Sequence, residues 1–423
     1  MCTRVAIRAG VVFSILAGLS AGAASAQAAD QDWAAPVSES LESLAERGVS
    51  ISPKVTQFVD GLVFGDGDYG PETGGKLDFK LGLASGPLGL WEGAFLNLHF
   101  EQVWGEDVNQ QGDGSIIPIN TALAFPRLGG SDTNLSVTLT QVFDGWSVTL
   151  GKFNMLDAAA ATPLIGGGGT DTFQNLGLAA PVSGVTPPYL LGGLLSVSTA
   201  PAEISLLVYD PRNAQNDNVL EAPFEDGVTF SLSATHETTI AGKPGYYGVR
   251  GVYSTLEGVD LKDIPQLILP PGFAAPVSNK KGYLFGSVSF QQFLSLHPDD
   301  PTKGWGVFGQ GAISDGNPNP IRGSLLFGVG GAAPFSGRSN DRWGIAGFRY
   351  FFSDVLKDSA DAVAGAVSAA ESFGIRDEWG FEAYYDLEIV RHVRVGADAQ
   401  FVRPGTPDRD TAFFLGVRGQ VVF

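Results

Sequence analysis

Residues 378–389 read EWGFEAYYDLEI, and this stretch decides the fold class because its side chains alternate between apolar and polar. A period of two is typical of a β-strand with one apolar and one polar face, whereas an amphipathic helix repeats about every 3.6 residues. The apolar positions are Trp379, Phe381, Ala383, Tyr385, Leu387 and Ile389, and the positions between them include Glu378, Glu382, Tyr384, Asp386 and Glu388. The stretch therefore predicts a strand with two different faces.

The same alternation recurs along the chain, interrupted by turns and loops rich in Gly, Asp, Asn and Pro. It continues in RHVRVGADAQFV at 391–402 and in TAFFLGVRGQVVF at 411–423. The segment 117–125 is ambiguous, because it fits either a replacement for a neighbouring strand or an extension of one. We predict sixteen strands in all; the remaining thirteen lie at 55–64, 74–83, 93–103, 133–143, 146–153, 190–199, 202–210, 226–236, 245–255, 282–292, 304–314, 321–331 and 341–352.

Soluble β-sandwiches alternate in the same way, so two other features choose between a sandwich and a membrane barrel. Aromatic residues such as Trp146, Trp305 and Trp343 lie near the ends of the apolar faces, as the interfacial girdles of a membrane barrel require. Charged residues lie in the middle of the opposite faces. In a sandwich these faces would form a dry core, and burying each unpaired charge there would cost several kcal/mol. Because a sheet spans a membrane only by closing on itself, we predict an all-β fold: a closed transmembrane antiparallel β-barrel of about 16 strands around a water-filled channel.

The composition is acidic, with 26 Lys and Arg against 45 Asp and Glu in 423 residues and a formal net charge of −19. This balance argues against nucleic acid as a partner, because phosphate binding needs a basic surface. It also argues against electrostatic docking on anionic lipid. Past the first thirty residues no run of 18 apolar residues occurs, which excludes helical membrane spans. The only cysteine is Cys2, so a disulfide scaffold is excluded, and we expect no cofactor.

The N-terminus has the three parts of a bacterial signal peptide. Arg4 and Arg8 form its positive region, an apolar stretch follows, and Ala24-Ser25-Ala26 forms the cleavage site. The alternative, a membrane anchor, is disfavoured because the apolar stretch is short and contains Gly and Ser. We expect export to the bacterial outer membrane. The predicted organisation is a signal peptide at 1–26, an N-terminal periplasmic segment at 27–54 with a short helix at 38–48, and a transmembrane β-barrel domain at 55–423.

Three longer segments interrupt the strands. Residues 154–189 contain Gly166–Gly169 and form the longest irregular insertion, and a loop of this length can fold into the lumen and narrow it. Residues 257–281 are rich in Pro and are predicted to form another loop. Residues 354–373 are rich in Ala with helical spacing, which predicts a helix inside one long connection.

No group of residues has the spacing of a catalytic or metal site, and we predict no enzyme activity. The Gly166–Gly169 run is not followed by Gly-Lys-Ser/Thr, so it indicates a flexible loop tip rather than a phosphate loop. DPRNAQNDN at 210–218 resembles a calcium loop but lacks the Gly and terminal Glu of an EF-hand, which favours a polar turn. No Gly-x-Ser-x-Gly elbow occurs, although an outer-membrane hydrolase assembled from separate strands stays an alternative. The histidines have no metal-ligand spacing; they are His99, His236, His297 and His392.

The polar faces of the strands supply the candidate functional residues, because these faces line the predicted channel. Charged and aromatic side chains there offer hydrogen bonds to hydroxyl groups and stacking faces for sugar rings, and passive transport requires binding weak enough to permit exit. The acidic surplus either favours neutral or cationic solutes or lies in the external loops, and both alternatives stay open. We predict no metal ligands; the predicted pore-lining residues are Lys80, His99, Glu101, Arg250, Glu382, Asp386, Arg394, Asp398 and Arg418.

Several segments, in this order and spacing, carry a resemblance to a known family. They are SLAERGVSI at 43–51, GGKLDFKLGL at 74–83, LWEGAFLNLHFEQVWG at 90–105, FDGWSVTLGKFNMLD at 143–157, GRSNDRWGIAGFRY at 337–350, Glu382 to Tyr385, and ADAQFVRPGTPDRDTAFFLGVRGQVVF at 397–423. With these segments the chain resembles the carbohydrate-selective porins of Gram-negative outer membranes, the OprB family.

The resemblance implies a sixteen-stranded barrel, a homotrimer or a monomer, that admits glucose and similar sugars by facilitated diffusion. It also implies an insertion signal for the barrel-assembly machinery, made of Phe423, Val421, Val417 and Leu415. The expected partners are small sugars or other hydrophilic solutes, outer-membrane lipid and lipopolysaccharide, and the barrel-assembly machinery. The expected function is passive, carbohydrate-selective diffusion of small hydrophilic solutes and ions. The alternatives are a non-selective porin, an outer-membrane barrel enzyme, and an adhesin or structural barrel with a plugged lumen.

Overall fold

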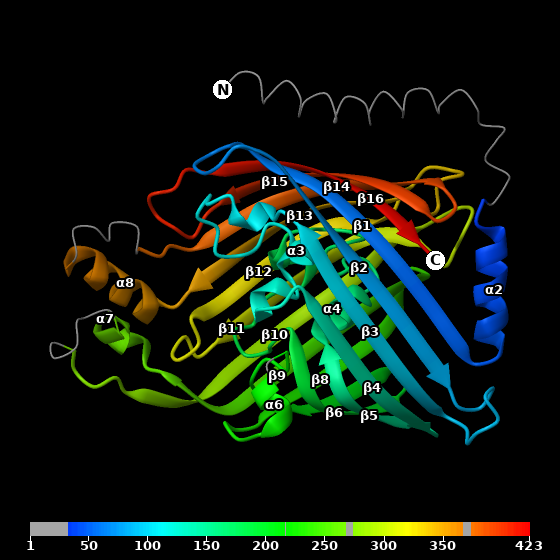
Figure 1. The fold of residues 1–423 in the computed structure, drawn as a ribbon, viewed down its shortest axis with the longest axis horizontal. Coiled ribbons are helices and arrows are strands. Elements are labelled where there is room, and N and C mark those ends of the chain that lie inside the picture. Colours follow the sequence, from blue (N-terminus) through cyan, green and yellow to red (C-terminus); the bar gives the residue numbers. More distant parts are fainter. Residues whose placement is uncertain (1–32, 216, 268–273, 367–373) are drawn as a thin grey trace.

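The structure is a computed structural model that describes residues 33–215, 217–267, 274–366 and 374–423, so the predicted signal peptide at 1–26 lies outside the described residues. Its strands pair antiparallel in chain order, and β16 pairs with β1, which closes the barrel (Figure 1). The strands are β1 (Val49–Phe64), β2 (Gly70–Ala84), β3 (Ala94–Gly105), β4 (Thr133–Phe143), β5 (Trp146–Asn154), β6 (Tyr189–Thr199), β7 (Ala202–Tyr209), β8 (Thr229–Ile240), β9 (Lys243–Val259), β10 (Asn279–Leu296), β11 (Gly304–Ser314), β12 (Ile321–Ala332), β13 (Arg342–Phe352), β14 (Glu378–Val390), β15 (Val393–Arg403) and β16 (Ala412–Val422).

The strand prediction is confirmed, because each of the sixteen expected ranges overlaps one strand of the closed antiparallel barrel. The ambiguous segment 117–125 is not a strand. It contains the short helix α3 (Thr121–Ala124), which Asn120 caps by accepting a hydrogen bond from the Leu123 N–H. The first helix, α2, spans Ala35–Glu46 rather than 38–48, with Pro36 in its first turn. Strand β1 begins at Val49 rather than at residue 55.

The two remaining predicted connections are more structured than a plain loop. In the Pro-rich segment 257–281, β9 continues to Val259 and is followed by η3 (Leu261–Asp263) and α7 (Ile264–Leu267), so the loop prediction is wrong for these residues. The Ala-rich segment forms α8 (Asp354–Ala366), as predicted, and its residues 367–373 lie outside the described part. No helix in the described part combines the length and apolarity that a membrane span would need.

Strand β14 shows how the alternation determines the barrel. The Phe381 side chain is 57 % exposed and points outward, whereas the next side chain, Glu382, is 1 % exposed and points inward. The register keeps these faces separate, since Phe381 lies opposite Phe401 on β15 and Glu382 lies opposite Gln400. A slip of one residue would exchange the two faces along the whole strand. The pattern therefore fixes both the facing and the register.

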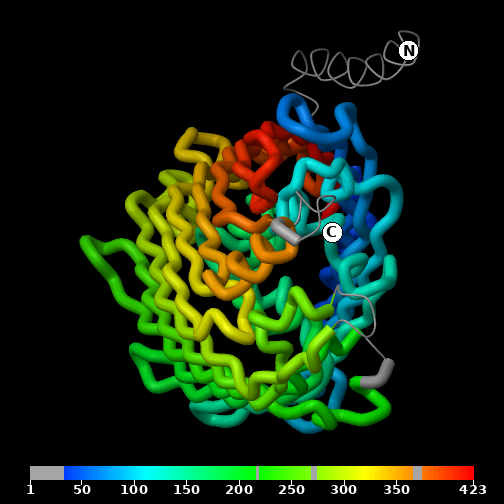
Figure 2. Tube along the Cα trace, turned by 90° about the vertical axis from the view of Figure 1, so that its left-hand side faces the viewer, coloured from blue at the N-terminus to red at the C-terminus, as the bar shows by residue number. Residues whose placement is uncertain are grey.

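The connections differ between the two ends of the barrel, which we call the turn end and the loop end. The turn end has short connections such as 144–145, 200–201 and 391–392, and α2 lies beside it (Figure 1). The loop end carries long connections, including 210–228 with α6 (Asp217–Glu221) and 353–377 with α8. Figure 2 looks at the barrel from the loop end, where inner segments of the chain occupy part of the ring of strands.

Two loop-end connections, 106–132 and 155–188, fold into the barrel. They contain η1 (Val108–Gln110), α3, η2 (Arg127–Gly129), α4 (Met155–Ala160) and α5 (Leu176–Ala179). Their apolar side chains pack on the inner wall: the Phe173 ring centroid lies 4.8 Å from that of Tyr384 and 5.9 Å from that of Phe308. Among the described residues, the apolar cluster with the most members therefore lies inside the barrel, between loop and wall.

Candidate functional site

The connection 155–188, which we call the crossing loop, runs across the inside of the barrel. The Leu164 N–H donates to Gln291 Oε1 on β10 at 2.7 Å. Further along, the Thr172 carbonyl oxygen accepts a hydrogen bond from Arg418 on β16, in a different part of the wall. The loop thus divides the lumen, and the expectation that this insertion folds inward is confirmed.

Two glutamates of β14 hold the two inner loops. Glu382 accepts hydrogen bonds from the backbone N–H groups of Gln174 and Asn175 in the crossing loop. Glu378, on the same face of the strand, accepts from the N–H groups of Ile116 and Ile117 at 2.7 and 2.9 Å. Each carboxylate therefore takes two consecutive amides of one loop. Glu382 lies on the inner face as expected, but the crossing loop covers it.

We expect Glu382→Ala to loosen the crossing loop. Two buried N–H groups lose their acceptor, and each unsatisfied buried donor costs about 1–3 kcal/mol. The variant should unfold at a lower denaturant concentration, and thermolysin should cleave within 155–188 faster than in the wild type. Glu378→Ala is the matched control, because in this variant thermolysin should cleave the 106–132 loop faster instead of the crossing loop. The same cleavage pattern in both variants would contradict this assignment.

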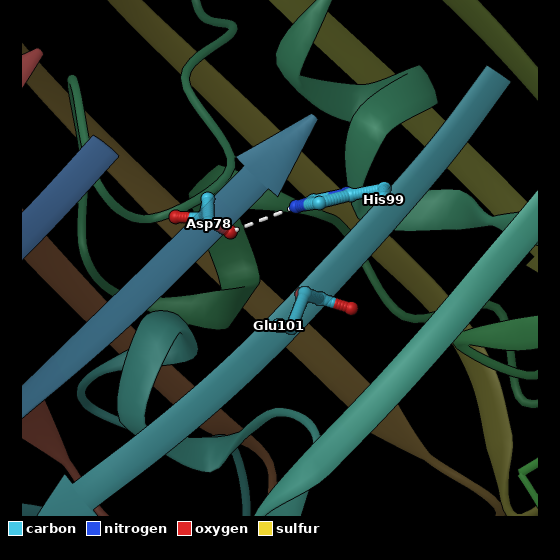
Figure 3. Close-up of side chains that lie close together, drawn as sticks. All are labelled: Asp78, His99 and Glu101. Atoms are coloured by element: carbon cyan, nitrogen blue, oxygen red, sulfur yellow. Dashed lines mark hydrogen bonds and ion pairs between the residues drawn. The ribbon is translucent and has the colours of Figure 1, made fainter. Parts of the chain in front are cut away.

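Strands β2 and β3 collect a buried charge network on one face (Figure 3). Asp78 lies directly opposite Glu101, and Lys80 lies opposite His99. The Lys76 ammonium is 2.8 Å from Glu101 Oε1 and 3.7 Å from Asp78 Oδ1, and His99 Nε2 is 3.1 Å from Asp78 Oδ1. Each buried charge therefore meets an opposite one, which reduces the free-energy cost of burying it.

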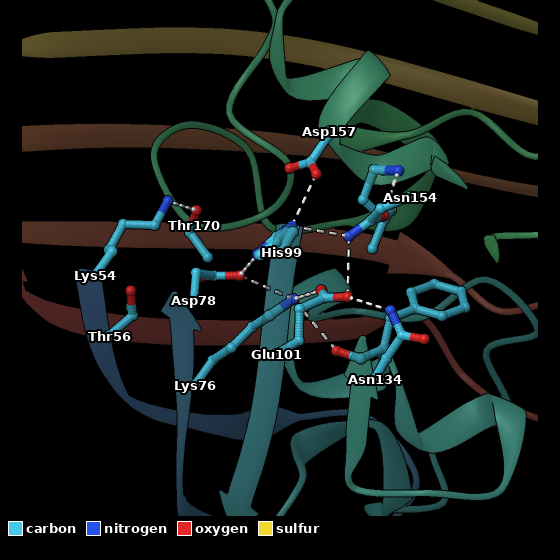
Figure 4. A network of polar contacts seen from close by, with 12 residues as sticks. Lys54, Thr56, Lys76, Asp78, His99, Glu101, Asn134, Asn154, Asp157 and Thr170 are labelled. Carbon is cyan, nitrogen blue, oxygen red and sulfur yellow. Dashed lines mark hydrogen bonds and ion pairs between the residues drawn. The ribbon is translucent and has the colours of Figure 1, made fainter. Parts of the chain in front are cut away.

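The crossing loop completes this network through Asp157 on α4 (Figure 4). Asp157 Oδ2 lies 2.8 Å from His99 Nδ1, and its Oδ1 lies 2.7 Å from Lys80 Nζ. Burial by itself raises the pKa of the Asp157 carboxyl. The contacts with His99 and Lys80 outweigh burial and hold this pKa below the ordinary value of an aspartate. Glu101 Oε2 accepts from the side-chain amides of Asn154 at 2.9 Å and Asn134 at 3.1 Å. The network therefore docks the start of the crossing loop on the wall.

Asp78, His99 and Glu101 also have the arrangement of a possible metal site, since their potential ligand atoms lie within 4.8 Å of one another. The sequence spacing did not show this group, because its members come from two paired strands. The buried Lys76 ammonium contacts both carboxylates, and both ring nitrogens of His99 contact carboxylate oxygens. A metal cation would have to displace the ammonium, so we assign the group to the charge network.

A second network centres on Asp386 of β14. Its carboxylate pairs with Arg394 on β15 and with Arg418 on β16, whose Nε lies 3.2 Å from Asp386 Oδ2. Gly396 lies between them, in register with both Asp386 and Arg418. A Cβ at Gly396 would come within 2.8 Å of Arg418 Nε. The glycine therefore leaves the space through which the ion pair reaches across a strand.

The structure places the nine sequence-predicted pore residues in different surroundings. The first network contains Lys80, His99 and Glu101, and the second contains Asp386, Arg394 and Arg418. Glu382 holds the crossing loop, and Asp398 accepts from Gln400, whose amide also donates to the Ile119 carbonyl oxygen in the other inner loop. Arg250 stands apart on β9, where it contacts Ser231 and Thr186.

Some residues of the site were absent from the predicted set. Lys54 and Asp60 occupy inward positions of β1. The period-two alternation places both residues on the polar face of this strand, so the sequence could have identified them. Asp171 lies in the crossing loop, where no pattern marks it, and pairs with Lys54 at 3.1 Å. Burial raises the pKa of Asp171, but the positive charges of Lys54 and Arg342 lower it more, to about 2. This carboxylate therefore stays ionised at neutral pH.

The crossing loop leaves a vestibule on each side. The loop-end vestibule has a volume of about 730 Å³ and the turn-end vestibule about 840 Å³. Thr162 and Ile165 line the first, whereas Pro163 and Leu164 between them line the second. The loop-end vestibule is mainly apolar, and Arg250 is the one charged residue among the described residues that line it. The turn-end vestibule is lined by charges of both signs, among them Lys54, Lys303, Arg342, Asp171 and Glu388.

The acidic surplus of the chain lies mainly in the loop-end connections, two of which fold into the barrel. Every loop-end connection contains more Asp and Glu than Lys and Arg. The two inner networks, in contrast, combine cations with carboxylates. Of the two alternatives left open by the composition, the structure favours the one that places the surplus in the loops.

A closed antiparallel barrel whose lumen is divided by an inward loop, with a vestibule on each side, has the architecture of a porin. The chain belongs to the carbohydrate-selective porin family, OprB, whose family model matches residues 74–423. It is therefore a channel for passive diffusion in an outer membrane.

Solved structures support the fold. The high-pH structure of Pseudomonas putida OprB has a TM-score of 0.76 at 18 % identity, over 90 % of this chain and 96 % of that chain. The low-pH structure of the same protein has a TM-score of 0.52 at 14 % identity, over 93 % and 97 %. The outer membrane channel DcaP of Acinetobacter baumannii has a TM-score of 0.51 at 10 % identity, over 89 % and 97 %. No curated protein matches the chain in sequence.

Proposed function

We propose that the barrel lets small sugars diffuse across the outer membrane, with the crossing loop as its constriction. The observation that carries this proposal is the contrast between two walls of the loop-end vestibule. Short hydroxyl and amide side chains of β8, β10 and β11 line one wall, and apolar side chains of the inner loops line the other. A sugar ring has hydroxyl groups at its edge and C–H groups on its faces, so it matches both walls. Weak contacts of this kind permit entry and exit.

The orientation follows from the lengths of the connections. Bacterial barrels have short periplasmic turns and longer extracellular loops, so we place the loop end outside the cell and α2 in the periplasm. The N-terminal sequence at 1–26 then directs export and is removed. Outer-membrane lipid and lipopolysaccharide contact the outward apolar side chains, such as Phe327, Ile345 and Phe381, which are exposed on the isolated barrel.

The test of sugar passage is a glucose titration of single channels in a planar bilayer. We expect glucose to reduce the ion current beyond the change in bulk conductivity, because a sugar in the constriction obstructs the ions. A poly(ethylene glycol) too large to enter is the control and should leave the current unchanged apart from bulk conductivity. A non-selective porin would show only the bulk effect with glucose, and a plugged structural barrel would show no conductance.

We propose that no catalytic step accompanies transport. A serine–histidine contact at the turn end is the strongest feature for an enzyme: Ser38 Oγ on α2 lies 2.9 Å from His392 Nε2, and His392 Nδ1 lies 2.7 Å from the Val422 carbonyl oxygen. However, Ser38 is only 8 % exposed, and its hydroxyl also lies 3.2 Å from the Ala34 carbonyl oxygen. A nucleophile must be reachable by its substrate, so we assign this contact to the attachment of α2. Ester hydrolysis that Ser38→Ala abolishes would support the enzyme alternative.

Phe423, with Val421, Val417 and Leu415, is proposed as the signal for barrel assembly. The ring of Phe423 stacks on His392 with centroids 4.9 Å apart and meets Trp33 edge-on at 5.9 Å. We expect deletion of Phe423 to reduce the folded, membrane-inserted fraction several-fold, measured as the heat-modifiable band of outer-membrane extracts. Phe423→Tyr keeps an aromatic terminus and is the control. Normal insertion of the deletion variant would contradict the proposal.

A further inference from the structure

Arg250 differs from the cations of the two charge networks, because no described carboxylate forms an ion pair with it. The network cations each contact a carboxylate. Arg250 instead donates from Nε to Ser231 Oγ and from Nη2 to Thr186 Oγ1, both at 2.8 Å. Hydroxyl oxygens are neutral acceptors, and a guanidinium stays protonated in proteins. Its positive charge is therefore not neutralised by a direct contact.

The positive charge of Arg250 lies at the edge of an apolar cavity. Arg250 is half-buried, its Cζ lies 6.0 Å from the centroid of the Phe285 ring, and it borders the mainly apolar loop-end vestibule. A charge next to apolar surroundings costs free energy unless an opposite charge meets it. The vestibule, of about 730 Å³, is large enough for a small ligand to supply that charge.

A shelf of hydroxyl groups lies beside Arg250 on the same wall. Arg250 is in register with Ser233 on β8 and with Ser287 on β10. Gly248, the next inward position of β9, is in register with Thr235 and Ser289. A Cβ at Gly248 would come within 2.8 Å of Ser289 Oγ, so the glycine keeps the shelf open. Because neighbouring strands lie about 4.8 Å apart, the shelf offers hydroxyls at separations that span a sugar ring. It consists of Ser233, Thr235, Ser287 and Ser289, all of which line the vestibule.

We propose that the loop-end vestibule binds sugar acids, with Arg250 holding the carboxylate and the hydroxyl shelf holding the sugar hydroxyls. The inference rests on the proposed function and names a substrate class for it. A guanidinium binds a carboxylate through two parallel N–H···O bonds, and the bound anion neutralises the half-buried cation. The apolar side chains of the crossing loop cover the C–H face of the same ligand. The acidic loops at the mouth repel anions at low salt. Added salt screens this long-range repulsion far more than it weakens the direct contact between a carboxylate and Arg250.

The test compares glucuronate, glucuronamide and glucose as blockers of single-channel current, for the wild type and for Arg250→Gln. Glucuronate and glucuronamide have the same size and differ in charge. At about 1 M salt, where the Debye length is about 3 Å, we expect wild-type half-block at about tenfold less glucuronate than glucuronamide, which corresponds to about 1.4 kcal/mol. Arg250→Gln should remove this difference by weakening glucuronate block about tenfold more than glucuronamide or glucose block.

Arg322→Gln is the matched control, because Arg322 is a half-exposed guanidinium that pairs with Asp354 and does not line the vestibule. It should keep the wild-type preference for glucuronate, and heat-modifiable migration confirms that each variant is folded. An unchanged glucuronate block in Arg250→Gln, or an equal weakening of all three blockers, overturns the carboxylate subsite. A conducting wild-type channel that glucose does not block refutes sugar passage instead, so the two failures are distinguishable.

Discussion

Replacing the crossing loop with a short turn is expected to produce a wide, unselective channel. The replacement is geometrically simple, because Asn154 and Tyr189, which flank the loop, are directly opposite on neighbouring strands, and Asn-Gly makes a tight hairpin turn between such strands. The vestibules of about 730 and 840 Å³ then join, and an unobstructed sixteen-stranded barrel contains an aqueous channel. Single-channel conductance should rise several-fold, and glucose should no longer block the current.

This replacement also removes two carboxylates, so the effect of the lost charges on the current must be separated from the effect of the lost obstruction. Asp157 pairs with Lys80, and Asp171 pairs with Lys54. The double variant Asp157→Asn and Asp171→Asn keeps the loop and removes its charges. It should shift the reversal potential toward anions without the large rise in conductance. If the loop replacement folds and its conductance stays at the wild-type value, the crossing loop is not the constriction.

The second large effect is expected for Asp386→Ala. Arg418 is 1 % exposed, and the change leaves both Arg418 and Arg394 without their carboxylate. Removing one partner of a buried ion pair typically costs about 3–5 kcal/mol. The free energy of unfolding in detergent should fall by that order. Because Arg418 also donates to the Thr172 carbonyl oxygen, the current of the open channel should become noisier as the crossing loop loses an anchor.

A double-mutant cycle shows whether the loss comes from the ion pair. Arg418→Met removes the more buried cation, and the variant with both changes has no unpaired charge at position 418. We expect the double variant to be more stable than Asp386→Ala alone, since the coupling of neighbouring residues appears as non-additivity. Additive losses would mean that the two side chains contribute independently.

The fold was predictable because one local rule applies to every strand. In β14 and β15, facing is decided by residue parity, so Glu382, Asp386 and Asp398 could be assigned to the inner face from sequence alone. Their partners could not be assigned in this way. The amides that Glu382 binds belong to Gln174 and Asn175, about two hundred residues away in the chain, and no periodicity links a wall position to a loop position.

The segment 117–125 illustrates the limit of the pattern. Ile117 and Ile119 alternate with Pro118 and Asn120 as they would in a strand. The two isoleucines instead belong to an inner loop, and they are buried where this loop packs on the wall. An apolar alternation indicates that one face of a segment is buried. Tertiary context decides whether lipid or protein buries that face.

The pairing of β1 with β16 has a consequence for biogenesis. Among the described strands, the first in the chain pairs with the last, so this seam cannot form until β16 has been synthesised. Until then two unpaired edges expose backbone groups that hydrocarbon cannot solvate. A nascent or prematurely terminated molecule is thus a substrate for holding factors and proteases, and ribosome stalling before residue 412 should yield degradation products rather than smaller pores.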